Sequence, residues 1–278
     1  MSRAYLCVSI PVVSDEERGG APRRPASFEG VTDGIVRRIH PFFERFGAKP
    51  TYLLSRDVLG DPPCLSVFGA LGPSAELGTH LDGRLADDAR AGEREHLTEV
   101  TDLFIRAFGH QPLSFRGERG LGPDSAAILE SLGYAVDASV TPELGDARGG
   151  TAQPWALDAG GPLLELPVTT RARPLGRLPG LGRRFTPRQL RPVAIATPAL
   201  LRLAEEELRA ARAAAPTRPA FLHALLRNVD VVPWASPDGA SEEEARGVLD
   251  RLRTLLVFAR EKGISVVGLA DVPEILRQ

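Results

Sequence analysis

The residues best suited to chemistry follow the apolar, strand-like runs of this chain. The segment Glu76-Leu77-Gly78-Thr79-His80-Leu81-Asp82 places an imidazole and a carboxylate where an apolar strand would run into a loop. A second histidine, His223, ends the run Phe221-Leu222-His223. Imidazole and carboxylate groups bind metals and transfer protons. His80, Asp82 and His223 are therefore candidates for either kind of chemistry.

Two arginines stand at a similar position. Arg116 ends the run Leu113-Ser114-Phe115, and Arg119 follows three residues later. A guanidinium at the end of a buried strand is costly unless it has a partner. This favours a role in a site for Arg116 and Arg119 over the alternative of a surface pair.

Strand and helix patterns alternate along the whole chain, and this alternation would position these residues. The predicted strands are 4–10, 50–54, 76–80, 113–116, 135–140, 163–168, 220–223 and 265–269. The predicted helices are 31–46, 93–108, 123–132, 197–214 and a last one that starts with a capping box of Ser241 and Glu244 and ends at Gly263. Such alternation favours a single α/β domain over residues 1–278 with a mainly parallel sheet, as a closed or distorted barrel. Active sites of such barrels lie at the carboxyl ends of the strands.

Composition limits the class of protein. The chain has 278 residues, 43% hydrophobic and 25% charged, which is enough for a full core. The net charge of -2 gives no general reason to expect nucleic acid or an anionic membrane as partner. Two cysteines do not indicate a disulfide framework, and no apolar run is long enough to be a transmembrane segment. We expect a cytoplasmic protein.

Several segments, in order, resemble the polysaccharide deacetylases with a NodB-homology domain, which form carbohydrate esterase family four. The resemblance covers nearly the whole chain. It rests on Phe46–Leu54, Glu76–His80, Ser114–Gly120, Leu129–Tyr134 with Asp137–Val140, Leu164–Val168 and Phe221–His223. It implies a distorted (β/α) barrel of about seven mainly parallel strands that removes N-acetyl groups from amino sugars.

The resemblance also implies a mechanism. In the family, an aspartate and two histidines hold a divalent metal, usually zinc, whose bound water attacks the amide carbonyl. A second aspartate acts as base, an arginine orients it and a late histidine protonates the leaving amine. His80 matches the first metal histidine, Arg116 the orienting arginine and His223 the late acid.

The sequence departs from this pattern at the metal ligands. Pro11 and Val12 stand where the two aspartates are expected, and neither can bind a metal. The second metal histidine is replaced by Arg84, although Asp82 could serve as a ligand in a shorter version of the motif. Catalytic zinc sites usually have three protein ligands. We therefore predict a degenerate metal site of His80 and Asp82 that binds zinc weakly or in an altered arrangement.

Two functions remain open from the sequence. One is a carbohydrate-directed hydrolase that cleaves an N-acetyl amide or an ester on a sugar or glycoconjugate. Its site would be a rearranged metal site of His80 and Asp82, with or without Asp15, or a metal-free site of His80, Asp82 and His223. The other is an inactive relative that binds sugar or acts as a scaffold in polysaccharide or glycoconjugate biosynthesis.

Further residues bear on the ligand. An arginine-, proline- and glycine-rich loop is predicted at about 171–196, and its residues 171–191 include seven arginines and no acid. It is either a solvated loop or a flap in which Arg183 and Arg184 bind an anionic sugar, such as a uronate or a phosphorylated sugar. Trp234, after the His223 strand, could stack on a sugar or be a half-buried loop residue, and Trp155 leaves the same choice.

Overall fold

The strands of the protein form one curled, mostly parallel sheet. The computed structural model describes residues 3–16, 26–82, 92–118, 124–141, 153–157, 161–178, 182–236 and 241–278. Nine strands form the main sheet, and their order is β10-β1-β2-β3-β4-β5-β7-β6, with β11 also paired to β1. They are β1 (Ala4–Val12), β2 (Thr51–Leu54), β3 (Glu76–Leu81), β4 (Ser114–Gly117), β5 (Val136–Asp137), β6 (Trp155–Ala156), β7 (Leu164–Glu165), β10 (Ala220–Leu225) and β11 (Ser265–Val267).

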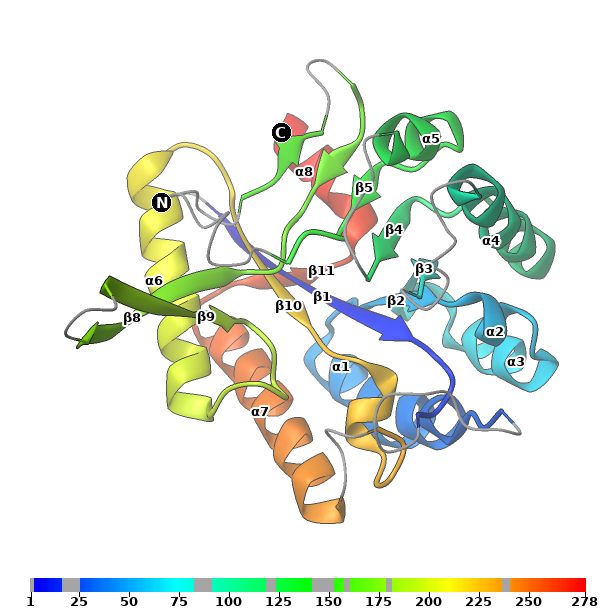
Figure 1. The fold of residues 1–278 in the computed structure, drawn as a ribbon, viewed down its shortest axis with the longest axis horizontal. Helices are drawn as coiled ribbons and strands as arrows, with labels where there is room; N and C mark the ends of the chain where they lie inside the picture. The colour runs from blue at the N-terminus through cyan, green and yellow to red at the C-terminus, as the bar shows by residue number, and fades with distance from the viewer. Residues whose placement is uncertain are drawn as a thin grey trace.

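Helices surround this sheet (Figure 1). They are η1 (Gly30–Ile39), α1 (His40–Phe46), α2 (Arg56–Leu59), α3 (Pro62–Leu71), η2 (Gly72–Ser74), α4 (Glu93–Phe108), α5 (Ser125–Ser131), α6 (Thr197–Ala214), η4 (Asn228–Val231), α7 (Glu242–Glu261), η5 (Leu269–Asp271) and α8 (Val272–Arg277). The eight predicted strands and five predicted helical segments are all present. The predicted single α/β domain with a distorted, mainly parallel barrel is thus confirmed.

Local signals explain where the helices begin and end. Ser241 Oγ accepts a hydrogen bond from the main-chain N–H of Glu244 at 3.2 Å and caps α7, as its capping box predicts. Gly47 and Gly109, which follow α1 and α4, have φ values of 59° and 74°. Residues with a Cβ atom rarely adopt this conformation, so glycine is the favoured residue there.

The segment after β7 closes much of the remaining gap in the barrel. The main-chain N–H of Thr169 donates to the carbonyl oxygen of His223 in β10 at 3.0 Å, and Leu190 N–H donates to the carbonyl of Thr169 at 2.8 Å. Leu225 N–H in turn donates to the carbonyl of Leu190 at 3.1 Å. These bonds join the two ends of the curled sheet beside β10.

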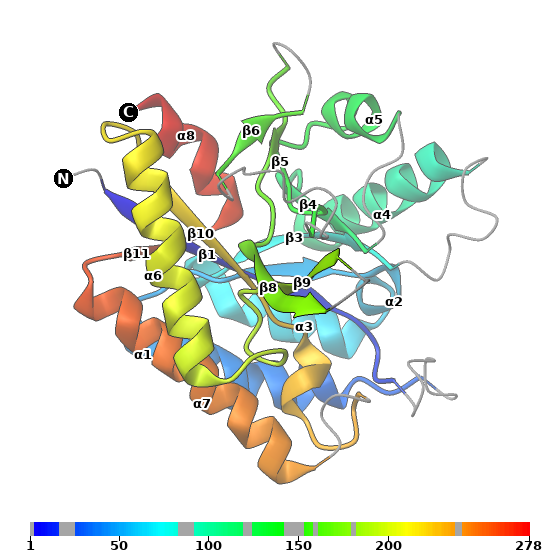
Figure 2. The same ribbon diagram turned by 60° about the vertical axis from the view of Figure 1, so that its left-hand side comes forward.

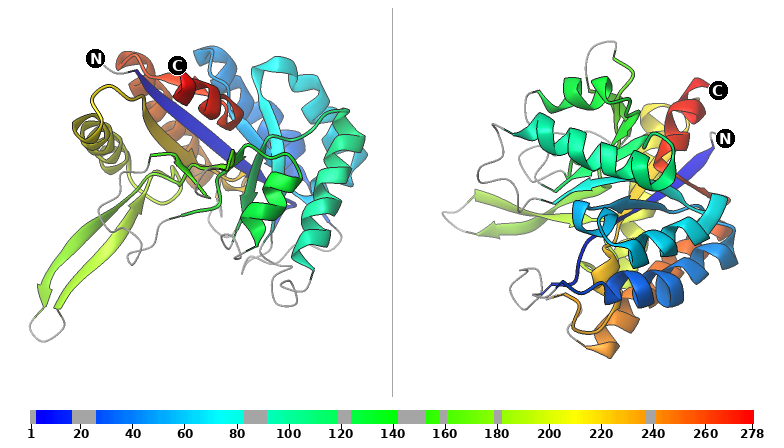
Figure 3. Two further views of the ribbon diagram at one scale, coloured as in Figure 1. Left: turned by 90° about the horizontal axis from the view of Figure 1, so that it is seen from above. Right: turned by 90° about the vertical axis from the view of Figure 1, so that its right-hand side faces the viewer.

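The predicted loop at about 171–196 is largely wrong. Residues 170–178 and 182–189 form an antiparallel β-hairpin of β8 (Thr170–Leu178) and β9 (Gly182–Gln189). Figure 2 shows the hairpin in front of the barrel, and Figure 3 shows it projecting from the body of the molecule. Proline and glycine suggested an irregular loop, but an antiparallel pair outside the main sheet tolerates both residues because its outer edges need no further partner.

The core follows the alternation of side chains along the strands. On β1, Leu6, Val8 and Ile10 pack on the helix side of the sheet, whereas Tyr5 and Cys7 belong to a separate inner cluster. Within the described ranges, no helix has the length and hydrophobicity needed to cross a lipid bilayer.

Candidate functional site

Strand register brings four inward-facing side chains to the same end of the barrel. His80 in β3 is paired with Arg116 in β4, and β1 presents Pro11 two residues beyond Ser9, which is paired with Leu225 in β10. These strands are parallel, so their carboxyl ends meet at one rim.

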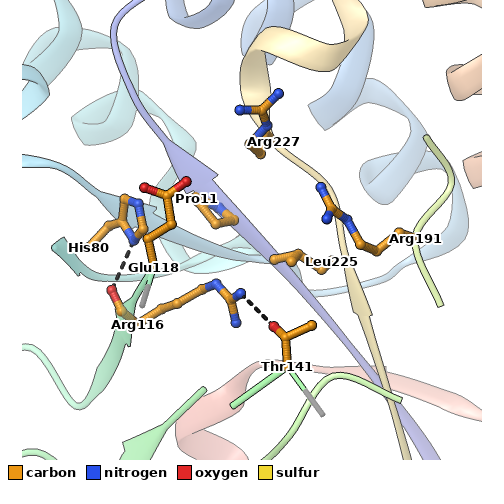
Figure 4. A pocket seen from close by; sticks show the side chains of 8 residues that line it. All are labelled: Pro11, His80, Arg116, Glu118, Thr141, Arg191, Leu225 and Arg227. Atoms are coloured by element: carbon orange, nitrogen blue, oxygen red, sulfur yellow. Dashed lines mark hydrogen bonds between the residues drawn. The ribbon is translucent and has the colours of Figure 1, made fainter. Parts of the chain in front are cut away.

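The rim encloses a pocket of about 340 Å³. Its lining comes from strand ends and from the segments that follow them: Pro11, His80, Arg116, Glu118, Thr141, Arg191, Leu225 and Arg227 (Figure 4). In this view Arg191 and Arg227 lie across the pocket from His80 and Glu118. The lining therefore combines three guanidinium groups, one carboxylate and one imidazole.

His80 is a buried, neutral imidazole. Its Nδ1 donates a hydrogen bond to the main-chain oxygen of Arg116 at 2.9 Å, which leaves Nε2 as the nitrogen with the lone pair. Burial, followed by the positive charge of Arg116, lowers the pKa of His80 to about 4. At neutral pH His80 is therefore an acceptor, able to take a hydrogen bond from a ligand hydroxyl.

Arg116 is fixed in the wall of the pocket. Its guanidinium donates to the main-chain oxygen of Ala138 and, at 3.0 Å, to Thr141 Oγ1. Burial lowers the pKa of Arg116 to about 10, the negative charge of Asp137 opposes this shift, and the positive charge of Arg191 adds to it. Arg116 is still charged at neutral pH, and it is repelled by Arg191.

A pair of buried carboxyl groups lies close to Arg116. Asp137 and Glu165 are register partners in β5 and β7, and both are fully buried. Asp137 Oδ1 accepts a hydrogen bond from Ser139 N–H at 3.1 Å, and Glu165 Oε1 accepts one from Val140 N–H at 3.0 Å. Asp137 Oδ2 and Glu165 Oε2 have no hydrogen-bond partner among the described residues.

The two carboxyl groups cannot both be charged at low cost in this environment. Burial, followed by the charge of Asp137, raises the pKa of Glu165 to about 11. We therefore assign one shared proton to the pair, carried mainly by Glu165. The single remaining negative charge balances Arg116.

Arg227 and Arg191 complete the cationic side of the pocket. Arg227 forms ion pairs with Glu16 at 3.1 Å and with Asp230 at 3.0 Å, so acidic groups fix its position. Arg191 directly follows Leu190, whose carbonyl oxygen is bonded to β10. Both arginines thus stand on segments that are tied to the barrel rim.

The predicted site residues are only partly brought together. His80 and Arg116 line the pocket, whereas Asp82 is half-buried at the end of β3 and is not among the described lining residues. Trp234 is 58% exposed, beyond η4. Arg119 and the side chains of Arg183 and Arg184 lie outside the described residues.

His223 is beneath the pocket rather than in its lining. It is fully buried, its Nδ1 donates to the main-chain oxygen of Leu166 at 2.9 Å, and its Nε2 accepts a hydrogen bond from Ser9 Oγ at 2.7 Å. Burial, followed by the charge of Arg116, lowers the pKa of His223 to about 3. In this position His223 joins β10 to β1 and to the segment after β7.

The donor set does not fit a divalent metal. Among the described residues, no three histidine, cysteine, aspartate or glutamate side chains gather as a metal site would require. Asp15, the third ligand considered from the sequence, accepts hydrogen bonds from the main-chain N–H groups of Glu29 and Gly30 and from Ser27 Oγ. It holds the start of η1, and the three arginines around His80 would repel a cation.

Three residues of the lining, Thr141, Arg191 and Arg227, were not predicted from the sequence as site residues. The position of Arg227 could have indicated a site role, because Arg227 comes shortly after the strand that contains His223. Arg116 and Glu118 have a similar position, at the end of the strand 113–116 and just after it. Arg191 was noted only as part of the arginine-rich segment. Thr141 had no signal of its own, since threonine at a strand end is ordinary.

No family model and no curated protein matches the sequence. Solved structures do match. A candidate polysaccharide deacetylase from Mycobacterium smegmatis superposes with a TM-score of 0.61 at 17% identity, over 99% of this chain and 91% of that one. The chain has the polysaccharide deacetylase fold.

Other solved structures share this deacetylase fold. PuuE allantoinase matches with a TM-score of 0.63 at 15% identity, over 99% of this chain and 90% of that one. A CE4 family pseudoenzyme from Bacillus anthracis matches with a TM-score of 0.52 at 12% identity, over 98% of this chain and 66% of that one. The fold thus occurs in proteins named as enzymes and in one named as a pseudoenzyme, so the chemistry of the pocket has to be argued from its own residues.

Proposed function

We propose that this protein is a non-catalytic relative of the polysaccharide deacetylases that binds an anionic sugar or glycoconjugate in the pocket at the barrel rim. The observation that supports this proposal is the lining itself. Three arginines line the same pocket as His80, and Pro11 lies where the family's first aspartate is expected. A cationic pocket of this kind favours a carboxylate or phosphate group over a metal ion.

The arginines divide the binding of such a ligand between them. Arg116 and Arg191 repel each other, and an anion between them would relieve that repulsion. The Glu16 and Asp230 partners of Arg227 hold it in place, so its role is mainly to shape this side of the pocket. His80 Nε2 would accept a hydrogen bond from a sugar hydroxyl next to the anionic group.

Titration of the protein with galacturonic acid, and separately with glucose 1-phosphate, tests this proposal by calorimetry at low ionic strength. We expect Arg191→Ala to weaken binding of the preferred ligand at least tenfold, and added salt to weaken binding to the wild type. Arg37→Ala is a matched control, because Arg37 is an exposed arginine of η1 with a single 3.5 Å ion pair to Asp33. Binding that is absent, or equal in Arg191→Ala and Arg37→Ala, would exclude the proposal.

A metal-free hydrolase is the second candidate, supported by Glu118. This carboxylate is exposed and lines the same pocket as His80, so it could act as a general base toward a bound ester or amide. Hydrolysis of an acetylated sugar that persists in chelator and disappears in Glu118→Gln would favour this candidate. We expect no such hydrolysis, because no three described metal-ligating side chains gather to hold a metal that would activate a water molecule.

A further inference from the structure

Trp234 adopts a backbone conformation that suits glycine. It has φ of 64°, and among the described residues it is the one non-glycine residue with positive φ. It follows Pro233 in a turn closed by a 3.2 Å hydrogen bond from Ala235 N–H to the carbonyl oxygen of Val232. Proline at the second position and positive φ at the third define a type II turn, in which glycine or asparagine is preferred at the third position.

The tryptophan side chain is also exposed. Its exposed fraction is 58%, one of the highest among the large hydrophobic residues of the described chain. Burial in the core therefore does not account for a large aromatic residue at a strained position. Residues held in sparsely populated backbone regions are found disproportionately at binding sites.

This turn is attached to the anion pocket through a short series of contacts. The carbonyl oxygen of Ala235 accepts a 2.7 Å hydrogen bond from the main-chain N–H of Glu16. The carboxylate of Glu16 holds the pocket residue Arg227 at 3.1 Å. Asn228, next to Arg227, bonds both main-chain groups of Val13, at 3.0 Å and 2.9 Å. The Trp234 turn is thus anchored to the same rim as the pocket.

We infer that Trp234 forms a second subsite, on which a neutral face of a neighbouring sugar ring stacks while an acidic sugar occupies the arginine pocket. The inference rests on the proposed function and extends it. The ligand is then an acidic oligosaccharide of at least two residues, and a single uronate or a phosphate ion fills only part of the site. Pyranose rings present C–H faces that pack on an aromatic ring, and tryptophan offers the largest such surface.

Fluorescence can observe this subsite directly, because the chain has only two tryptophans, Trp155 and Trp234. In a Trp155→Phe background Trp234 is the single reporter. We expect trigalacturonic acid or a hyaluronan tetrasaccharide to shift its emission and to bind about tenfold more tightly than the corresponding monomeric uronic acid. The neutral trisaccharide maltotriose should not bind measurably.

Substitutions of Trp234 separate stacking from a structural role. Trp234→Gly and Trp234→Ala should both lose the advantage of the oligosaccharide over the monomer, and Trp234→Tyr should keep most of it. Relief of backbone strain should make Trp234→Gly melt about 2–4 °C above Trp234→Ala, the reverse of the usual order of glycine and alanine.

The outcomes also separate this inference from the proposal on which it rests. Monomer binding that depends on Arg191, with no gain for either oligosaccharide or a gain that survives in Trp234→Gly, overturns the stacking subsite and leaves the anion pocket intact. Absence of binding by every acidic sugar removes the proposed function together with the subsite.

Discussion

Removing the shared proton of Asp137 and Glu165 offers a quantitative test of how the pocket is built. Glu165→Gln replaces the protonated carboxyl by a neutral amide, which is able to donate a hydrogen bond to the Asp137 carboxylate. At pH 7 the folded chain holds a proton on Glu165, whereas the unfolded chain releases it above its ordinary pKa of 4.5. This difference in proton binding is worth about 1.4 kcal/mol per pH unit. Relative to a pH below 4.5, it lowers the free energy of unfolding at pH 7 by up to about 3 kcal/mol.

The sign of the pH dependence follows from the raised pKa. Because the folded state binds the proton more tightly, the contribution of Glu165 to stability is fully present below pH 4.5 and decreases as pH rises toward 11. Glu165→Gln should therefore be at least as stable as the wild type at pH 7. It should also lack this part of the decline of stability between pH 5 and 9.

The double variant Asp137→Asn with Glu165→Gln completes the experiment. It removes both buried carboxylates and leaves the exposed Glu118 as the remaining acidic group that acts on Arg116, which should cost about 3–5 kcal/mol. Asp137→Asn alone should cost much less, because Glu165 can then ionise and balance Arg116. Urea unfolding followed by circular dichroism at pH 5, 7 and 9 measures all four proteins. A Glu165→Gln variant that loses several kcal/mol at pH 7 while the wild-type pH dependence persists would refute the shared proton.

Three further predictions concern the site and its support. Because the pKa of His80 lies near 4 and the arginines stay charged, anion affinity measured by calorimetry should be constant between pH 6 and 8; an increase below pH 6.5 would show that a histidine in the site becomes protonated. Ser9→Ala should cost about 1–3 kcal/mol in urea unfolding because it leaves the buried Nε2 of His223 without its donor, and no loss would contradict that hydrogen bond. Gly30→Ala should cost about 1–3 kcal/mol, since its Cβ would lie 2.7 Å from Asn228 Nδ2 and 3.0 Å from Asp15 Oδ1, whereas the control Gly69→Ala in α3 has open space and should gain about 0.5–1 kcal/mol; equal effects would rule out this close packing.

Much of the fold could be predicted from the sequence because local signals and the global topology agree. The apolar runs correctly predicted the eight parallel strands, and glycines such as Gly109 correctly predicted the ends of helices. The β8–β9 hairpin was missed because Pro174 and Pro187 interrupt its strands and conceal any alternation. Its pairing is set by the chain on either side and not by a local pattern.

Only part of the candidate site could be predicted from the sequence, and the reason is geometric. His80 and Arg116 were found because they end apolar runs on adjacent strands. His223 also ends a predicted run, but β10 continues to Leu225, so His223 lies one layer below the rim and Leu225 reaches the pocket. Arg191 and Arg227 line the same pocket as His80 only because the barrel curls, and a local sequence pattern does not reveal long-range closure of this kind.

Pro11 and Val12 stand where the family has its two aspartates. We therefore propose, as the central claim, that this pocket binds an anion and not a metal ion. Calorimetric titration of metal-free wild-type protein with zinc, and then with galacturonic acid in the presence of chelator, tests that claim most directly. We predict that the acidic sugar binds with unchanged affinity in chelator, and that zinc binds no more tightly to the wild type than to His80→Ala. One zinc per chain that requires His80, together with sugar binding that requires zinc, would contradict it.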